Sequence, residues 1–583
     1  MNWLGGALSA LVLGASALFV ACSSDEAAPV DAGVDAPIFN PTGCQGTRCS
    51  SDLHEVLDCN DQVIKRCPEG EGCTPGGSCI PACESARLNK STLGCEYYAV
   101  DPGTDGSADG SCFAAFVANT WTAPLNLAVA YDGKDLDVST FARVPVGSGP
   151  ALRYDPLPSG QLPPGQVAIL FLADFAAPGV PSATRCPAGV TAAVSNGLAS
   201  SSKTAILKAF SIRTTAPVVA YDMFPYGGAA SYISSATLLV PVSAWGDNYV
   251  GVTGFPRGPA VPVSSLSQPF LQIAAAEDGT EVTVRPSAAI VGDTGVAPSP
   301  ANTPQTYSLA KGQVLQLKQN EDLTGSIVKA NKPVGVWGGS SCMYIEVTDN
   351  ACDSAHQQLV PARALGTRYI GARYRDRLQG REEAPPWRIV GVVDGTQLSY
   401  EPSPPVGAPT TIQSGQSVIF RANAAFVVKS QDGAHPFYLA GHMTGQQSSG
   451  LDFGVGDPEF VSAVATEQYL RSYVFMTDPT MSFTNLVITR LKGPKGFADV
   501  ELDCGGKLVG WQPVGNPGDL HFTRFDMVVS GNGVGACNNG RHSIKSDQPF
   551  GLTVWGWDKT VSYAYPAGAS IAPINEVVVP VVK

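Results

Sequence analysis

The segment Lys329-Ala-Asn-Lys-Pro333-Val-Gly-Val-Trp337 has close counterparts along the chain, and their recurrence is the strongest indication of the architecture. Each counterpart is a short strand-like run, a proline and then an almost continuous apolar run, and the prolines are Pro217, Pro333, Pro436 and Pro549. They lie 116, 103 and 113 residues apart, which is the size of a small domain. The apolar runs lack the alternation of a half-exposed strand, so we expect them to be buried on both faces.

Three further markers recur in the same order around these prolines. They are Leu239-Val240-Pro241, Leu359-Val360-Pro361 and Val578-Val579-Pro580; Gly165-Gln166, Gly312-Gln313 and Gly415-Gln416; and Asp278-Gly279-Thr280 with Asp394-Gly395-Thr396. Independent landmarks in one order indicate duplication. The main body is therefore predicted to be a tandem repeat.

Within a repeat the segments are short and strand-like, with Gly, Asp and Pro between them. In the second repeat we predict strands over 270–275, 281–285, 313–318, 326–330 and 334–337, and in the first a hairpin of 113–119 with 125–132. Six or seven strands in just over 100 residues match a two-sheet sandwich. The predicted fold is all-β, with four tandem homologous β-sandwich-like units; a closed β-propeller is the alternative.

These patterns divide the chain into seven segments. We expect a signal peptide and lipobox at 1–22, a disordered tether at 23–43, a cysteine-rich module at 44–95, and β-units 1 to 4 at 96–235, 236–355, 356–457 and 458–583.

The first 21 residues are small and apolar and too short for a confident membrane span. They end in Phe19-Val20-Ala21-Cys22-Ser23, which resembles the bacterial lipobox, where the cysteine receives lipid. Phe19 stands where Leu is usual, and an ordinary leader cleaved near Ala21 is the alternative. Ser23 favours sorting to the outer membrane, so we expect a lipid-anchored protein at the outer membrane or cell surface, facing the periplasm or the exterior. The acidic, Pro- and Gly-containing segment that follows has little to bury.

Eight cysteines fall within residues 44–95, where few large apolar side chains accompany them. Disulfides must then replace a core, although the sequence does not choose among the pairings. A zinc site is the alternative, but the spacings do not form two clean knuckles. With Cys22 lipidated, fourteen of the fifteen cysteines remain to pair in an oxidising compartment.

Charge and motifs exclude several functions. The net charge of −13 and the lack of a basic stretch argue against nucleic acid as a partner. None of the six histidines lies in a metal-binding pattern, and the two Ser-x-x-Lys matches, at Ser200 and Ser326, lack their companion motifs. Asp101, Asp105 and Asp109 do not have the spacing of an EF-hand, and a solvated loop is expected there. We predict no catalytic residues, no metal and no cofactor.

A family resemblance rests on Gly94-Cys95-Glu96-Tyr97-Tyr98-Ala99-Val100, the Asp-Gly-Thr turns, residues 324–334 and the pair Cys342 and Cys352. The chain resembles, over roughly residues 95–570, the N-terminal domain of the IgG-Fc-binding protein, which also occurs in bacterial surface lipoproteins. The resemblance implies extracellular binding or adhesion, with an extracellular protein or glycan as the partner. The alternative is a secreted hydrolase, possibly directed at glycans, whose paired carboxylates are dispersed in the sequence.

Three disulfides are predicted inside the units. Cys342 with Cys352, Cys504 with Cys537 and Cys112 with Cys186 each fall within one unit and bridge a loop between strand-like segments.

Overall fold

The computed structural model describes most of the chain that follows the expected tether. The described residues are 46–103, 108–147, 151–175, 180, 183–255, 268–293, 295–345, 352–378, 380–446, 455–516 and 518–582. They belong to one compact unit. The segments predicted over residues 1–43, including the lipobox, lie outside the described residues.

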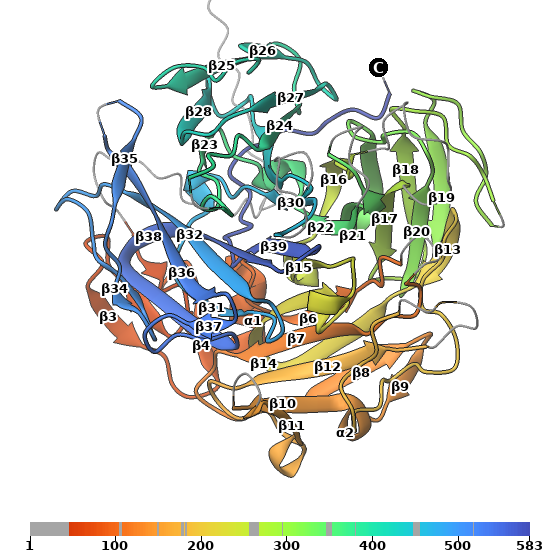
Figure 1. Cartoon of the computed structure of the whole chain (residues 1–583), viewed down its shortest axis with the longest axis horizontal. Helices are drawn as coiled ribbons and strands as arrows, with labels where there is room; N and C mark the ends of the chain where they lie inside the picture. Colours follow the sequence, from red (N-terminus) through yellow and green to blue (C-terminus); the bar gives the residue numbers. More distant parts are fainter. Residues whose placement is uncertain are drawn as a thin grey trace, which may run out of the picture. The chain divides into compact units, whose positions relative to one another are not determined.

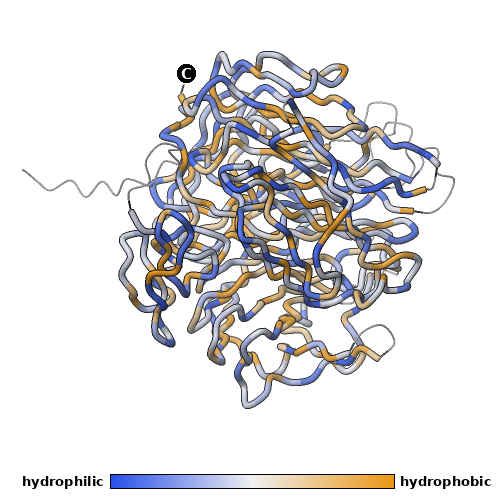
Figure 2. Tube along the Cα trace, turned by 90° about the vertical axis from the view of Figure 1, so that its left-hand side faces the viewer, coloured by the Kyte–Doolittle hydropathy of each residue, from blue (hydrophilic) through white to orange (hydrophobic). Residues whose placement is uncertain are grey.

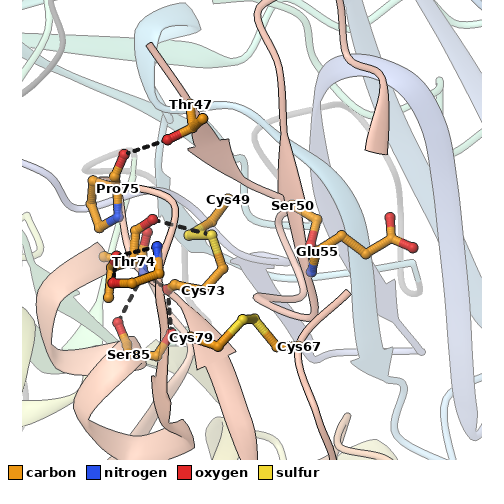
Figure 3. Close-up of a disulfide and its surroundings, with 12 residues drawn as sticks. Thr47, Cys49, Ser50, Glu55, Cys67, Cys73, Thr74, Pro75, Cys79 and Ser85 are labelled. Carbon is orange, nitrogen blue, oxygen red and sulfur yellow. Dashed lines mark hydrogen bonds between the residues drawn. A yellow bond between two sulfur atoms is a disulfide. The ribbon is translucent and has the colours of Figure 1, made fainter. Parts of the chain in front are cut away.

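Disulfides hold together the small module at the start of the described chain (Figure 3). Cys49 pairs with Cys73 and Cys67 with Cys79, while Cys83 pairs with Cys95 and so joins the module to the first strand of the main body. Its strands carry exposed apolar side chains such as Ile64 (55% exposed), so cross-links compensate for a core that the segment is too short to build. Its elements are β1 (Arg48–Cys49), β2 (Glu55–Leu57), β3 (Val63–Arg66), β4 (Glu71–Cys73), β5 (Cys79–Pro81) and α1 (Ala82–Asn89).

The main body is all-β and repeats one sandwich four times (Figure 1). The third unit shows the plan most simply, because its two four-stranded sheets are separate: β23-β28-β25-β26 and β27-β24-β29-β30. Its strands are β23 (Arg368–Gly371), β24 (Pro386–Gly391), β25 (Thr396–Glu401), β26 (Thr411–Ile412), β27 (Ser417–Arg421), β28 (Phe426–Ser430), β29 (Phe437–Met443) and β30 (Glu459–Ser462).

In the other three units the strands equivalent to β28 and β29 run on as one long strand. The first half of this strand belongs to one sheet and the second half to the other. In the second unit, residues 327–330 of the long strand pair with β18 and residues 334–340 pair with β17. The strands of this unit are β16 (Gly246–Val250), β17 (Pro269–Ala275), β18 (Thr280–Arg285), β19 (Gln305–Leu309), β20 (Gln313–Lys318), β21 (Ile327–Met343) and β22 (Asp353–Leu359).

The first unit follows the same plan around its long strand. Its elements are β6 (Gly94–Ala99), β7 (Phe113–Asn119), β8 (Leu127–Tyr131), β9 (Lys134–Leu136), α2 (Val138–Phe141), β10 (Ala142–Val146), β11 (Arg153–Pro156), β12 (Val167–Ala173), β14 (Phe210–Phe224) and β15 (Ser235–Leu239). The expected hairpin of residues 113–119 with 125–132 is wrong. β7 pairs with the second half of β14 and β8 with the first half, because the two strands lie in different sheets of the sandwich. The intervening strand β13 (Ala205–Lys208) joins the second unit by pairing with β20.

The fourth unit contains β31 (Leu470–Met476), β32 (Phe483–Leu491), β33 (Val500–Leu502), β34 (Gly506–Lys507), β35 (Gln512–Val514), β36 (Leu520–Val529), β37 (Asn532–Gly533), β38 (Arg541–Trp557) and β39 (Ser562–Pro566). Its long strand β38 pairs with β31 and β33 before the proline and with β32 and β39 after it. The four-unit, sandwich-like architecture predicted from the sequence is therefore present.

Each repeat proline stands where the chain passes from one sheet to the other. The ladder registers shift there, between Arg213 and Val218 in β14 for example, so the missing N–H of the proline falls at a break in the hydrogen bonding. After the bend the strand is buried along its length: residues 334–343 of β21 and all of β29 are buried. Hydrophobic residues, orange in Figure 2, are accordingly distributed through all of the described body, in several separate cores.

A tyrosine fastens each bend. The hydroxyl groups of Tyr97, Tyr249, Tyr369 and Tyr473 donate to the carbonyl of the residue that follows the repeat proline: Val218, Val334, Phe437 and Phe550. In the last three units the same hydroxyl accepts the N–H of the residue three positions earlier, Gly246, Gly366 or Leu470. This shared contact places the four prolines at one equivalent position.

The innermost strands β15, β22, β30 and β39 gather at the centre of the body (Figure 1). Each is an edge strand of its own sheet, paired only with the long strand or its equivalent in that unit. β15 and β22 run across the boundaries expected at residues 235 and 355, since each completes the sheet of the preceding unit.

The segment that follows β39 ties several units together. Its Asn575 side chain donates to the carbonyls of Ala362 and Leu365, and Val579 exchanges two hydrogen bonds with the Asn248 side chain. Residues 574–582 thus lie along the second and third units.

Candidate functional site

The structure places the predicted disulfides within their units. Cys112 is joined to Cys186, Cys342 to Cys352 and Cys504 to Cys537, over sequence separations of 74, 10 and 33 residues. They close loops at the ends of β7, β21 and β33. The predicted lipidation site Cys22 lies outside the described residues.

The histidines are dispersed through the fold. His442 is 2% exposed and stacks against Phe255, and burial lowers its pKa well below the usual range, so its ring is neutral. His542 lies 2.9 Å from Asp503, and these two with Cys504 form the one set of metal-type ligands that converges within 4.8 Å among the described residues. Because Cys504 is bonded to Cys537, it offers no thiolate to a metal.

Acidic side chains converge instead where the four innermost strands meet. The first residues of these strands are Ser235, Asp353, Glu459 and Ser562, and each is 0% exposed. The Asp353 carboxylate accepts the Ser562 N–H at 2.8 Å, the Ser562 hydroxyl donates to the Asp457 carbonyl, and the Glu459 carboxylate accepts the Phe460 N–H. The second and fourth units are thereby joined across the centre, and the fourth is joined to the third.

A buried, hydrogen-bonded histidine–aspartate pair borders this centre. His356 Nε2 of β22 lies 2.6 Å from Asp222 Oδ1 of β14, and both side chains are 0% exposed. The backbone N–H of His356 also donates to the Ser235 hydroxyl at 3.0 Å. Polar side chains, and not a backbone ladder, therefore connect the edges of the four sandwiches.

Burial controls the protonation of these carboxyl groups. It raises the pKa of Asp353 well above the usual range, and the nearby charge of Asp457 adds to the increase. The pKa of Glu459 is raised by burial as well, and that of Asp222 is raised although His356 opposes the shift. A carboxylic acid held neutral can donate a hydrogen bond as well as accept one, which suits a sealed polar centre.

Substrate cannot reach these carboxyl groups in this conformation. Catalysis by paired acids needs a cleft in which the two carboxyls flank a bound substrate. Asp222, Asp353 and Glu459 are fully buried, Asp457 is 1% exposed, and none of them lines the two cavities described next. The cluster is built to hold the units together.

The first cavity is small and lies between the third and fourth units. Its volume is about 40 Å³, and its wall includes Trp387, His442, Tyr469 and Trp555. Such a space admits one or two water molecules and no sugar. Since Trp337, Trp387, Trp555 and Trp557 are all 0–5% exposed, these tryptophans belong to the core.

The second cavity has a volume of about 340 Å³ and lies between the second unit, the third unit and the C-terminal segment. It is lined by Arg285, Ser287, Asn302, Pro304, Gly325, Ser414, Gly415, Val581 and Val582. It is the larger of the two, and its lining combines a charged side chain with polar neighbours, as small-molecule sites have.

Sequence reasoning missed two groups of residues. The repeated tyrosines carried a signal, because Tyr249 and Tyr369 each lie eight residues after a Val-Pro marker and three after a glycine. The acidic centre carried none, since the residues that begin its four strands, Ser235, Asp353, Glu459 and Ser562, are each more than 100 positions from the next. Asp101 and Asp109, expected in a solvated loop, are 3% and 8% exposed, and Asp105 lies outside the described residues.

Comparison with known proteins identifies relatives of most of the body. A family model described as IgGFc binding protein matches residues 235–556. A human protein named IgGFc-binding protein is 26% identical over 345 residues, which cover 57% of this chain and 6% of the human protein. The chain thus corresponds to a small fraction of that relative's length. No solved structure matches it.

Proposed function

Because the chain belongs to the IgGFc-binding protein family, we propose that it is a non-catalytic binding protein that engages an extracellular protein or glycan. The family match carries this proposal. The buried state of the converging carboxyl groups supports it, because the hydrolase alternative requires such a pair to be open to substrate.

The cysteine chemistry supports an extracytoplasmic location. The described residues include six disulfides, and Cys59 is disulfide-bonded as well. Such bonds persist in oxidising compartments and are rare in the cytosol. In the described part of the chain, no helix combines the length and apolar character that a membrane span requires. We propose anchoring through lipid on Cys22, at the outer membrane or cell surface.

Binding is tested with the purified full chain on a biosensor. The analytes are immunoglobulin Fc, the matched Fab fragment and an array of extracellular glycans. Saturable binding to Fc or to a defined glycan, lost after reduction of the disulfides, is the expected result. Turnover of a glycan or peptide substrate without stable capture would contradict the proposal.

Anchoring is tested by metabolic labelling with a palmitate analogue. Only a thiol at position 22 accepts the diacylglyceryl group, so Cys22→Ser should carry no label and should leave the membrane fraction. Ser23→Ala is the matched control and should label like the original chain. Equal labelling of the Cys22→Ser chain would contradict lipid attachment at this residue.

A further inference from the structure

The cavity between the second and third units is lined by a buried cation, Arg285, that has no partner among the residues that the structure describes. Arg285 ends β18 and is 8% exposed, and it is the one charged side chain among the described residues that line the cavity. No hydrogen bond or ion pair joins its guanidinium to any residue in the described ranges. Its nitrogen atoms are not among the enclosed, unpartnered polar atoms of the described chain, so solvent reaches them, and Arg285 itself lines the cavity.

Other buried arginines in this protein are satisfied by carboxylates. Arg388, 2% exposed, lies 2.9 Å from Asp322, and Arg377, 3% exposed, lies 2.8 Å from Glu383. An unpaired charge removed from bulk water lowers stability unless something compensates it. Arg285 is therefore the exception among the described residues, and an anion bound in the cavity would compensate its charge.

The rest of the wall indicates what kind of anion fits. Ser414 contributes a hydroxyl group and Asn302 an amide, while Pro304 and Val581 contribute apolar surface. The Ser287 hydroxyl also lines the wall and already contacts Ser326 and the Asp322 carbonyl. A pyranose ring presents hydroxyl groups at its rim and C–H groups on its face, which matches this mixture. The volume of about 340 Å³ is at the lower end of small-ligand pockets and suits one monosaccharide unit.

Charge selects a carboxylate over more highly charged groups. One guanidinium neutralises one negative charge, and its planar donors match a carboxylate in a two-point contact. The chain as a whole carries a net charge of −13, which opposes the approach of polyanions.

Two glycines shape the wall where the units meet. Gly325 has φ +90°, and a Cβ there would come within 2.0 Å of the Gly415 carbonyl oxygen. The close approach of these loops closes one side of the cavity.

We propose that this cavity binds an acidic monosaccharide unit, with the sugar carboxylate on the Arg285 guanidinium. This inference rests on the proposed binding function and names the chemical class of one ligand. Ser287, Asn302 and Ser414 contact the ring hydroxyls, and Pro304 with Val581 covers the apolar face of the ring.

The test is saturation-transfer NMR on the full chain with glucuronic acid, with glucose as the neutral counterpart and inorganic sulfate as the simple anion. Saturable glucuronate binding is expected, with no binding of glucose at equal concentration. Arg285→Gln should weaken glucuronate binding roughly tenfold or more, because a charge-assisted pair is lost. Arg541→Gln, on an exposed residue of β38, is the matched control and should bind like the original chain.

Thermal unfolding without ligand provides a second readout. Removing an unpaired buried charge should leave the midpoint of Arg285→Gln unchanged or higher. A lower midpoint in a variant that still folds cooperatively would show that the protein already satisfies the guanidinium and would overturn the proposal. Should that variant fail to fold, Asn302→Ala at an exposed wall position must weaken glucuronate binding instead.

The remaining outcomes are equally decisive. Absence of saturable glucuronate binding, or sulfate binding as tight as glucuronate, overturns the assignment of an acidic sugar. If the chain captures Fc or another extracellular partner but not glucuronate, the pocket assignment fails and the proposed function stands. If it captures none of them, both fail.

Discussion

The tyrosine that fastens each bend gives the sharpest test of the repeat. In the second unit, Tyr249 is 1% exposed, accepts the Gly246 N–H at 2.9 Å and donates to the Val334 carbonyl at 2.7 Å. Tyr249→Phe retains the ring and leaves both backbone groups without a partner. An unsatisfied buried group costs about 1–3 kcal/mol. Removing the hydroxyl also removes the cost of burying it, which offsets part of this loss. We therefore expect the free energy of unfolding to fall by about 2–4 kcal/mol.

Urea unfolding followed by circular dichroism measures this loss as a lower midpoint at constant slope. Tyr369→Phe should cost a similar amount, because its hydroxyl makes the equivalent contacts at 3.1 and 2.7 Å. Tyr232 is 68% exposed, so Tyr232→Phe should change stability by less than about 0.5 kcal/mol. If Tyr249→Phe changed the midpoint no more than Tyr232→Phe, the proposed role of the hydroxyl at the bend would be refuted.

Two other predictions concern the core and the buried acids. Trp555 is 3% exposed, and its ring centroid lies 4.9 Å from that of Tyr374. Trp555→Ala should therefore lower the free energy of unfolding by about 3–5 kcal/mol in chemical denaturation, and Trp511→Ala, at a half-buried position, should lower it less. An unchanged midpoint for Trp555→Ala would contradict its place in the core. Burial raises the pKa of Asp101 from 3.8 to about 7, so its protonated form stabilises the fold below about pH 4, and this contribution is lost as pH rises through 7. Asp101→Asn should remove this pH dependence and raise the free energy of unfolding above pH 7 by on the order of 4 kcal/mol relative to the original chain. Unfolding measured at pH 4, 6 and 8 tests this. Parallel pH profiles for the two chains would contradict the raised pKa.

Local patterns were sufficient for much of the fold. The predicted strands at 270–275, 281–285 and 313–318 agree closely with β17, β18 and β20, because alternation, glycine turns and prolines act within a few residues. The spacing of the repeat prolines is enough by itself to indicate four units. The sequence likewise singled out the three cysteine pairs that are joined within those units.

The pairing of strands was decided only by tertiary structure. Residues 113–119 and 125–132 are neighbours in sequence and were expected to form a hairpin, yet the long strand β14 recruits them into different sheets. The backbone groups at the edge of a strand are the same for every sequence, so they do not specify the partner strand. The bend at Pro217 and the packing of the two sheets determine which strands pair.

The two candidate sites also came from long-range packing. The acidic centre joins residues such as Asp353 and Ser562, which are 209 positions apart, and the Arg285 cavity is closed by loops of two units and the C-terminal segment. Sequence alone determined which residues form strands and where the repeats begin, because backbone propensity and periodicity are local. Which charges are buried, paired or left facing a cavity depended on how the four sandwiches pack, because burial is a property of the whole fold.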